Sequence, residues 1–242
     1  MEKKILELSC LSTKKFFVFD LDGVLINSTE MGFVKINQIL SYLGLENVSE
    51  EFLRPHWGKR LSELYGLVCD EVGANDEQRQ EVLDLEPIIS ADLPYEFSRE
   101  LFESLTNLRL FGFYIGLITS RTDNSLKLIA KQVGLNLEIF DQLQTVNHFY
   151  HHKPDGRVFG PFINWAAARK ISPIEMVYIG DTIENDYAAT QDCDPKLDFI
   201  GVVSGATTGS EFLNAGIPPC RIVEFAHLPS FLHHIIRQKV EA

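Results

Sequence analysis

The chain has 242 residues, 45% of them hydrophobic, and it carries a formal net charge of −12 at pH 7. This length predicts one large domain or one domain with an insert, and the composition supplies enough apolar residues for a core. An acidic chain without a basic stripe is poorly suited to bind nucleic acid or an anionic membrane, and no apolar run reaches the roughly 18 residues of a membrane span. We therefore expect a cytoplasmic globular protein whose widely spaced cysteines, Cys10 among them, are reduced thiols.

Short apolar runs alternate with helical patterns along the chain. Runs bounded by Gly, Asp or Ser are typical of strands buried on both faces of a parallel sheet. Five strands are predicted in this way: residues 16–19, 114–118, 176–179, 199–203 and, more weakly, 221–225. Helical spacing of apolar residues predicts three helices between them: residues 126–133, 159–170 and 184–191. The alternation predicts an α/β protein with a doubly wound, Rossmann-like parallel sheet.

One stretch, residues 29–95, interrupts this alternation. It contains no run typical of a strand, and its apolar residues are spaced as in helices. Helices are predicted there over residues 31–43, 61–72 and 77–85, and a glycine follows each of the first two. We therefore predict an all-helical domain of residues 29–95, inserted into an α/β core that consists of residues 1–28 and 96–242.

Carboxylates follow two of the predicted strands. Asp20 and Asp22 come directly after the first strand and precede Gly23, which permits a tight turn, while Asp181 and Asp186 follow the strand at residues 176–179. Neighbouring carboxylates repel each other, so they are tolerated best where a cation neutralises them, and Mg²⁺ prefers such oxygen ligands. Either motif alone is equally consistent with a helix cap that has no chemical role.

Hydroxyl groups and a lysine complete the set of polar residues. Thr119 and Ser120 follow the strand at residues 114–118, and hydroxyl and backbone N–H groups at a helix start can bind a phosphate. Lys153 precedes Pro154 in a predicted loop. Considered singly, the two hydroxyl residues are more typical of a helix cap, and the lysine is more typical of a solvated surface group. Ligands bind at the carboxyl edge of an open α/β sheet, however, and these motifs are predicted to meet there.

In this order, the motifs resemble those of the haloacid-dehalogenase-like phosphohydrolase superfamily. Residues 19–24 read Phe-Asp-Leu-Asp-Gly-Val, like the first motif of that family; Thr119 corresponds to the second motif, Lys153 to the third and residues 180–186 to the fourth. The helical segment lies where the family has its cap domain. Residues 201–216 are similar to the phosphoglycolate-phosphatase and β-phosphoglucomutase branch.

The resemblance implies a mechanism and a cofactor. Asp20 would be the nucleophile that forms an aspartyl-phosphate, and Asp22 would protonate the leaving alkoxide and then activate water. Lys153, the Thr119 hydroxyl and the Ser120 N–H would neutralise the phosphoryl oxygens. Mg²⁺ would be held by the Asp20 and Asp181 carboxylates and the backbone carbonyl of Asp22, with Asp186 supporting metal-bound water or positioning Lys153.

An aspartate at position 22 favours phosphate esters, because the dehalogenases and phosphonate-cleaving enzymes of the superfamily lack it. We therefore predict a Mg²⁺-dependent phosphatase for a small phosphorylated metabolite, of the phosphoglycolate or sugar-phosphate type. The alternatives are a β-phosphoglucomutase-like phosphomutase and a catalytically silent binding protein on the same fold. Cations in the turn after the first cap helix are candidates to bind a second anionic group of the substrate, with a solvated helix start as the alternative: Arg54, Lys59 and Arg60.

Overall fold

A six-stranded parallel sheet forms the centre of the computed structural model, which describes residues 11, 13–59, 61–148 and 150–241. The strands are β1 (Phe16–Phe19), β2 (Tyr114–Ile118), β3 (Gln142–Gln144), β4 (Met176–Gly180), β5 (Asp198–Val203) and β6 (Ile222–Glu224). Their order is β3-β2-β1-β4-β5-β6, and all neighbouring strands are parallel. The strand order therefore reverses between β1 and β4, as in a Rossmann-type doubly wound sheet, and the predicted fold class is confirmed.

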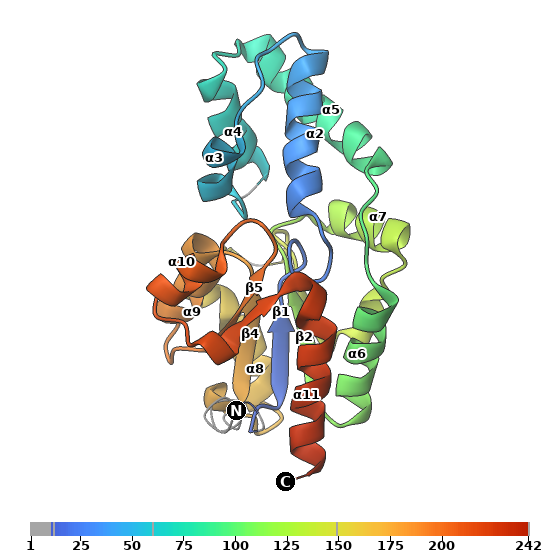
Figure 1. Ribbon diagram of the computed structural model, residues 1–242, viewed down its shortest axis with the longest axis vertical. Helices are drawn as coiled ribbons and strands as arrows, with labels where there is room; N and C mark the ends of the chain where they lie inside the picture. The colour runs from blue at the N-terminus through green and yellow to red at the C-terminus, as the bar shows by residue number, and fades with distance from the viewer. Residues whose placement is uncertain (1–10, 12, 60, 149, 242) are drawn as a thin grey trace.

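Helices cover both faces of the sheet (Figure 1). All four residues of β1 are buried, and the strand pleat sends Phe17 and Phe19 to one face and Phe16 and Val18 to the other. The first face packs against three helices: α6 (Arg99–Leu110), α7 (Asp123–Val133) and α11 (Leu228–Val240). The second face packs against three shorter helices: α8 (Gly160–Ala167), α9 (Ala188–Asp192) and α10 (Gly209–Asn214).

Among the described residues, four further α-helices form the cap, which lies beyond the carboxyl end of β1 (Figure 1). They are α2 (Thr29–Tyr42), α3 (Glu50–Leu53), α4 (Leu61–Glu71) and α5 (Asp76–Asp92). Their buried apolar residues, such as Phe33, Leu64 and Val82, form a core of their own. The three predicted cap helices are confirmed, although α5 continues well beyond residue 85. The boundaries at residues 28/29 and 95/96 stay a prediction.

Several elements differ from the sequence-based expectation. The polar edge strand β3 reads Gln-Leu-Gln, so a search for apolar runs does not detect it. Helices α6, α10 and α11 were not predicted. The expected helix over residues 159–170 is a 3₁₀ turn, Gly156–Phe159, followed by α8. The expected helix over residues 184–191 begins as a π-helical turn, Ile183–Tyr187, whose geometry shapes the site described below.

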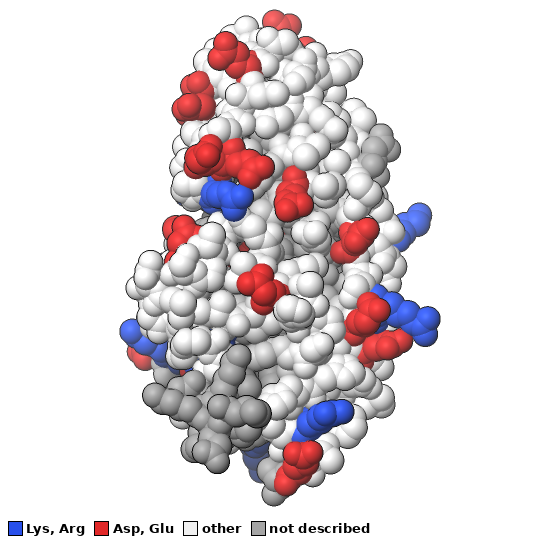
Figure 2. All heavy atoms as spheres, in the orientation of Figure 1, with Lys and Arg blue, Asp and Glu red and all other residues white. Residues whose placement is uncertain are grey.

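Acidic side chains are scattered over the face of the molecule shown in Figure 2, on the cap and on the sheet domain alike. Basic side chains on that face lie in small, separate groups, in keeping with the net charge of −12. Within the described part of the chain, no helix has both the length and the apolar character needed to cross a membrane. Cys69 and Cys193 are free, buried thiols, whereas Cys10 lies outside the described residues.

Candidate active site

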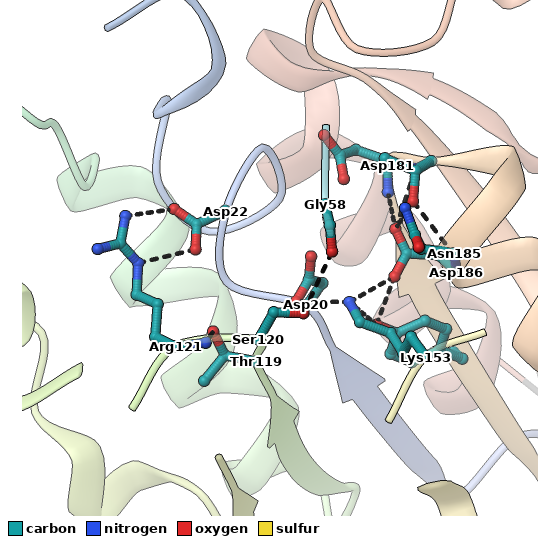
Figure 3. Close-up of polar contacts among 12 residues, drawn as sticks. Asp20, Asp22, Gly58, Thr119, Ser120, Arg121, Lys153, Asp181, Asn185 and Asp186 are labelled. Atoms are coloured by element: carbon teal, nitrogen blue, oxygen red, sulfur yellow. Dashed lines mark hydrogen bonds and ion pairs between the residues drawn. The ribbon is translucent and has the colours of Figure 1, made fainter. Parts of the chain in front are cut away.

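The polar motifs meet at the carboxyl edge of the sheet (Figure 3). Asp20 directly follows β1, and its backbone N–H donates to the carbonyl of Ile179 at 2.9 Å, which continues the β1–β4 pairing. Thr119 directly follows β2, and its N–H donates to the carbonyl of Gln144 at 3.0 Å. The ends of adjacent strands therefore hold these residues by main-chain hydrogen bonds, which fix side-chain positions more firmly than a free loop would.

Asp20, Asp181 and Asp186 form a buried carboxylate cluster. One oxygen atom from each lies within 4.8 Å of the others, and the three residues are 6%, 2% and 1% exposed. Burial raises the pKa of Asp20 to about 7, although the charge of Lys153 opposes the rise. Burial and the neighbouring carboxylates raise the pKa of Asp181 well above its usual range. Without a further cation, ionisation of the Asp20 and Asp181 carboxyl groups is therefore unfavourable.

Gly23 and Ser204 determine where the Asp181 carboxylate lies. Gly23 has a φ of +73°, and a Cβ atom on it would lie 2.1 Å from Oδ2 of Asp181. The hydroxyl of Ser204 donates to the same oxygen at 2.9 Å. A residue without a side chain at position 23 thus lets the β1 loop approach the carboxylate at the end of β4.

Lys153 contacts two carboxylates of this cluster. Its Nζ lies 3.1 Å from Oδ1 of Asp20 and 2.6 Å from Oδ1 of Asp186, and it donates to the hydroxyl of Tyr178 at 3.1 Å. Burial works to lower the pKa of Lys153, but the two carboxylates outweigh it and raise the pKa above its usual range. The lysine is therefore a permanent ammonium group beside the predicted nucleophile.

Both oxygens of Asp186 accept hydrogen bonds from the protein. Oδ1 accepts from Lys153 and from the Tyr178 hydroxyl at 2.8 Å; Oδ2 accepts from the backbone N–H and the hydroxyl of Thr182 at 3.0 and 2.6 Å. Burial works to raise the pKa of Asp186, but Lys153 and these donors outweigh it, so the pKa is lowered. The π-helical turn brings Asp186 into this position, which favours a role in orienting Lys153 over direct binding of a metal.

The cluster fits a divalent cation on charge and ligand type. Three carboxylates face one ammonium group, so two negative charges lack a partner when all of the carboxylates are ionised. Hard oxygen ligands of this kind suit Mg²⁺. Asp20 and Asp181 are the carboxylates best placed to hold it, because Lys153 and other donors already engage Asp186. A contribution from the backbone carbonyl of Asp22 stays a prediction.

The Asp22 carboxylate is turned away from this cluster, toward Arg121 (Figure 3). Nη2 of Arg121 donates to Oδ1 of Asp22 at 2.6 Å, and Nε donates to Oδ2 at 2.8 Å. Burial works to raise the pKa of Asp22, but the Arg121 charge and hydrogen bonds outweigh it, so the pKa is lowered. Arg121 directly follows Thr119 and Ser120, but no pattern in the sequence predicted a role for it.

The loop of the cap that contains Trp57 and Gly58 contacts the sheet domain. The hydroxyl of Ser120 donates to the carbonyl of Gly58 at 3.3 Å, and the side-chain amide of Asn185 donates to the carbonyl of Trp57 at 2.9 Å. Gly58 has a φ of +83°, and a Cβ atom on it would lie 3.0 Å from the Asn185 amide nitrogen. The cap is therefore docked on the same edge of the sheet as the carboxylates.

Two of the cations predicted to bind substrate from the cap, Arg54 and Lys59, line different cavities. Arg54 lies in a 3₁₀ helix, Arg54–His56, where it pairs with Glu50 at 2.9 Å and donates to the carbonyl of Gly205. It lines a cavity together with residues of α2 and Gly205, and the residues around this cavity include neither Asp20 nor Lys153. Gly205 follows Ser204, which donates to Asp181, so Arg54 contacts the loop beside the carboxylate cluster, and a contact of Arg54 with the substrate stays a prediction.

Lys59 lines the same cavity as Lys153. It pairs with Glu63 at 2.8 Å, and both residues line a cavity of about 710 Å³ that reaches Ser120, Lys153 and Asn185. Arg60 lies outside the described residues. A contact of Lys59 with the substrate stays a prediction.

The amino-acid sequence of this chain is similar to those of known proteins. The family model of the haloacid dehalogenase-like hydrolases matches residues 17–199. A pyrophosphatase PpaX of Bacillus velezensis is 23% identical over 199 residues, which cover 81% of this chain and 87% of that protein. A phosphoglycolate phosphatase of Vibrio parahaemolyticus is 26% identical over 186 residues, which cover 73% of this chain and 79% of that protein.

Solved structures with the same fold extend over almost the whole chain. A predicted phosphoglycolate phosphatase from Haemophilus somnus superposes with a TM-score of 0.73 at 18% identity, over 90% of this chain and 97% of that one. A hydrolase from Pseudomonas syringae superposes with a TM-score of 0.70 at 21% identity, over 92% of this chain and 99% of that one. At these identities the likeness concerns the fold.

Proposed function

Because the chain belongs to the haloacid dehalogenase-like hydrolase family, we propose that it is a Mg²⁺-dependent phosphatase for a small phosphorylated metabolite. One observation carries this proposal: the Asp20 carboxylate lies 3.1 Å from the buried ammonium group of Lys153 and within 4.8 Å of Asp181. A nucleophilic carboxylate, a fixed cation for the phosphoryl oxygens and a carboxylate for a metal are the groups that phosphoryl transfer requires.

The first step is phosphoryl transfer to Asp20. A carboxylate oxygen of Asp20 forms a bond to phosphorus in line with the leaving oxygen, and the bond from phosphorus to that oxygen breaks. In this proposal, Lys153 and the hydroxyl of Thr119 bind the phosphoryl oxygens and offset their negative charge. Bound Mg²⁺, held by Asp20 and Asp181, would supply further positive charge to the phosphoryl group.

Asp22 serves both halves of the reaction. In the first half its carboxyl group donates a proton to the leaving oxygen; in the second half the carboxylate takes a proton from the water that attacks phosphorus and regenerates Asp20. Asp22 has to leave its pair with Arg121 for either task, because both of its oxygens accept from the guanidinium in this structure.

The named relatives support a small substrate, because one is a pyrophosphatase and another a phosphoglycolate phosphatase. A substrate of the phosphoglycolate or sugar-phosphate type accords with both. A phosphomutase would use the same first step but return the phosphoryl group to another hydroxyl of the sugar. A silent binding protein would have no need of Asp20, Lys153 and Asp181 in this arrangement.

A substrate screen tests the proposal. The purified protein is incubated with Mg²⁺ and, in separate reactions, with p-nitrophenyl phosphate, 2-phosphoglycolate, pyrophosphate and glucose 1-phosphate, and released phosphate is measured. We expect phosphate release from at least one of them, and its loss in EDTA. Conversion of glucose 1-phosphate to glucose 6-phosphate without phosphate release would establish the phosphomutase instead. No turnover of any compound in a panel of phosphorylated metabolites would contradict the proposal.

A further inference from the structure

The pair formed by Asp22 and Arg121 joins two parts of the site that lie 99 residues apart in the sequence. The guanidinium holds the carboxylate with two hydrogen bonds, of 2.6 and 2.8 Å, and its remaining nitrogen donates to the hydroxyl of Ser125 at 3.1 Å. The side chains of Asp22 and Arg121 are still 26% and 16% exposed. The pair is therefore partly accessible to solvent.

A second ion pair lies on the cap side of this one. Lys35 of α2 donates to Glu86 of α5 at 2.6 Å and to the hydroxyl of Ser90 at 3.1 Å, and both charged residues are buried. Burial works to raise the pKa of Asp22 and of Glu86, but each pKa is lowered by the cation of its own pair and additionally by the cation of the other pair. The two pairs therefore lie within electrostatic reach of each other.

The leaving group of a substrate has to enter this region. When the phosphoryl group lies at Asp20, Asp22 must reach the oxygen that leaves, so the rest of the substrate lies next to Asp22 and its partner Arg121. A planar guanidinium binds a carboxylate or a phosphate through two parallel hydrogen bonds, as it now binds Asp22. An anionic group on the leaving group can therefore take the place of Asp22 on Arg121.

Given the proposed phosphatase function, we propose that Arg121 determines specificity by binding an anionic group of the leaving group in exchange for Asp22. A carboxylate or phosphate close to the ester oxygen pairs with Arg121, and Asp22 is released to face that oxygen. A neutral leaving group offers Arg121 no replacement, so the release of Asp22 leaves a partly buried cation unpaired. The substrate class is accordingly a phosphate compound with a second anionic group, such as 2-phosphoglycolate or pyrophosphate, rather than a singly phosphorylated sugar.

A matched pair of substrates tests this proposal. 2-Phosphoglycolate and 2-hydroxyethyl phosphate share a two-carbon leaving group and differ in whether it ends in a carboxylate or a hydroxymethyl group. The ratio of their kcat/KM values is measured for the wild-type protein and for Arg121→Met, Arg121→Lys and Arg99→Met. Arg99 is an exposed arginine paired with Glu103, so Arg99→Met is the control for loss of a positive charge.

We expect the wild-type protein to prefer 2-phosphoglycolate by roughly 100-fold, and Arg121→Met to lose most of that preference. Arg121→Lys keeps the positive charge but not the planar guanidinium with its two parallel donors, so we expect an intermediate ratio of the two kcat/KM values. This variant also tests the proposal if Arg121→Met fails to fold. Arg99→Met should keep the wild-type ratio. If both Arg121 variants lower the two kcat/KM values by the same factor, the inference is wrong and the proposed phosphatase function stands. If the wild-type protein releases phosphate from no compound of the screen, the proposed function fails and this inference fails with it.

Discussion

The ammonium group of Lys153 lies 3.1 Å from the carboxylate of Asp20, and both side chains are almost fully buried. The lysine comes from a loop and the aspartate from the end of β1, so the contact exists only in the folded chain. It is held from the other side by Asp186, whose Oδ1 lies 2.6 Å from the same nitrogen. This pairing links the stability of the fold to the chemistry of the site.

Replacement of Lys153 by methionine should therefore impair both the stability of the fold and the chemistry of the site. Without the ammonium group, Asp20 and Asp186 lose their cation while still buried, and we expect the free energy of unfolding to fall by about 3–5 kcal/mol. Urea denaturation measures this change. Lys15→Met removes an exposed lysine paired with Glu175 at 2.6 Å and should cost less than about 1 kcal/mol. Equal losses for the two variants would contradict this account of the buried pair.

Stability should also depend on pH in a manner that Mg²⁺ alters. Burial raises the pKa of Asp20 from 3.8 to about 7, so between these values the folded protein binds the proton more tightly than the unfolded chain does. Without metal, this group therefore favours folding at low pH and loses that contribution as the pH rises toward 7. Other carboxyls, with lowered pKa values, act in the opposite direction, so the effect is isolated by comparison with Asp20→Asn.

We expect Asp20→Asn to be more stable than the wild-type protein in EDTA at pH 7.5, and this advantage to shrink as the pH falls toward 4. Mg²⁺ at 100 times its Kd should stabilise the wild-type protein by about 2.7 kcal/mol and the variant much less. Thermal unfolding across this pH range, with and without Mg²⁺, measures both effects. An advantage of the variant that is independent of pH would contradict the raised pKa of Asp20.

Gly23→Ala should damage the site more than an equivalent change elsewhere. A Cβ atom at position 23 would meet Oδ2 of Asp181 at 2.1 Å, so the variant must displace the carboxylate or the loop. Gly44 is the matched control, because its φ of +69° is similar and nothing lies within 4 Å of its Cβ position. We expect Gly44→Ala to cost about 1 kcal/mol of stability, from the backbone alone. Gly23→Ala should lose more stability and, in addition, affinity for Mg²⁺, measured by titration calorimetry; equal effects would exclude the close approach.

Asn185→Ala should weaken the docking of the cap on the sheet domain. The variant removes the hydrogen bond to the carbonyl of Trp57, and a single such bond corresponds to a change of roughly three- to tenfold in an equilibrium. We therefore expect KM to rise by that factor, with a smaller change in kcat, and the exposed Asn214→Ala to match the wild-type protein. A large loss of kcat with KM unchanged would instead point to a role for Asn185 at the metal or the phosphoryl group.

Sequence patterns were sufficient for the features that depend on local spacing. The apolar run before Asp20 predicted β1, and the absence of polar residues within this run predicted a strand buried on both faces. The edge strand β3 was missed because two of its three residues are glutamines. The extension of α5 to Asp92 includes Pro87, which is ordinarily a signal that a helix ends.

Contacts between segments that lie far apart in the sequence could not be predicted from these patterns. Asp22 was expected to face the reacting oxygen, whereas in the structure it pairs with Arg121, and nothing local to either residue indicates the other. The contact of Arg54, which lies in a short 3₁₀ helix, with the carbonyl of Gly205 was likewise not predicted from the sequence. Tyr178, which orients Asp186, was read only as a strand residue, although a hydroxyl in an otherwise apolar strand could have drawn attention to it.

The central claim is that Asp20 carries the phosphoryl group, and chemical trapping tests it most directly. The protein is mixed with Mg²⁺ and a substrate identified in the screen, quenched with borohydride, digested and analysed by peptide mass spectrometry. Borohydride reduces an acyl phosphate to an alcohol and releases phosphate, so the trapped residue is converted to homoserine. We predict this conversion at Asp20 alone, and only when substrate is present. Conversion at Asp22 or Asp181, or turnover of the substrate without any conversion, would contradict the mechanism.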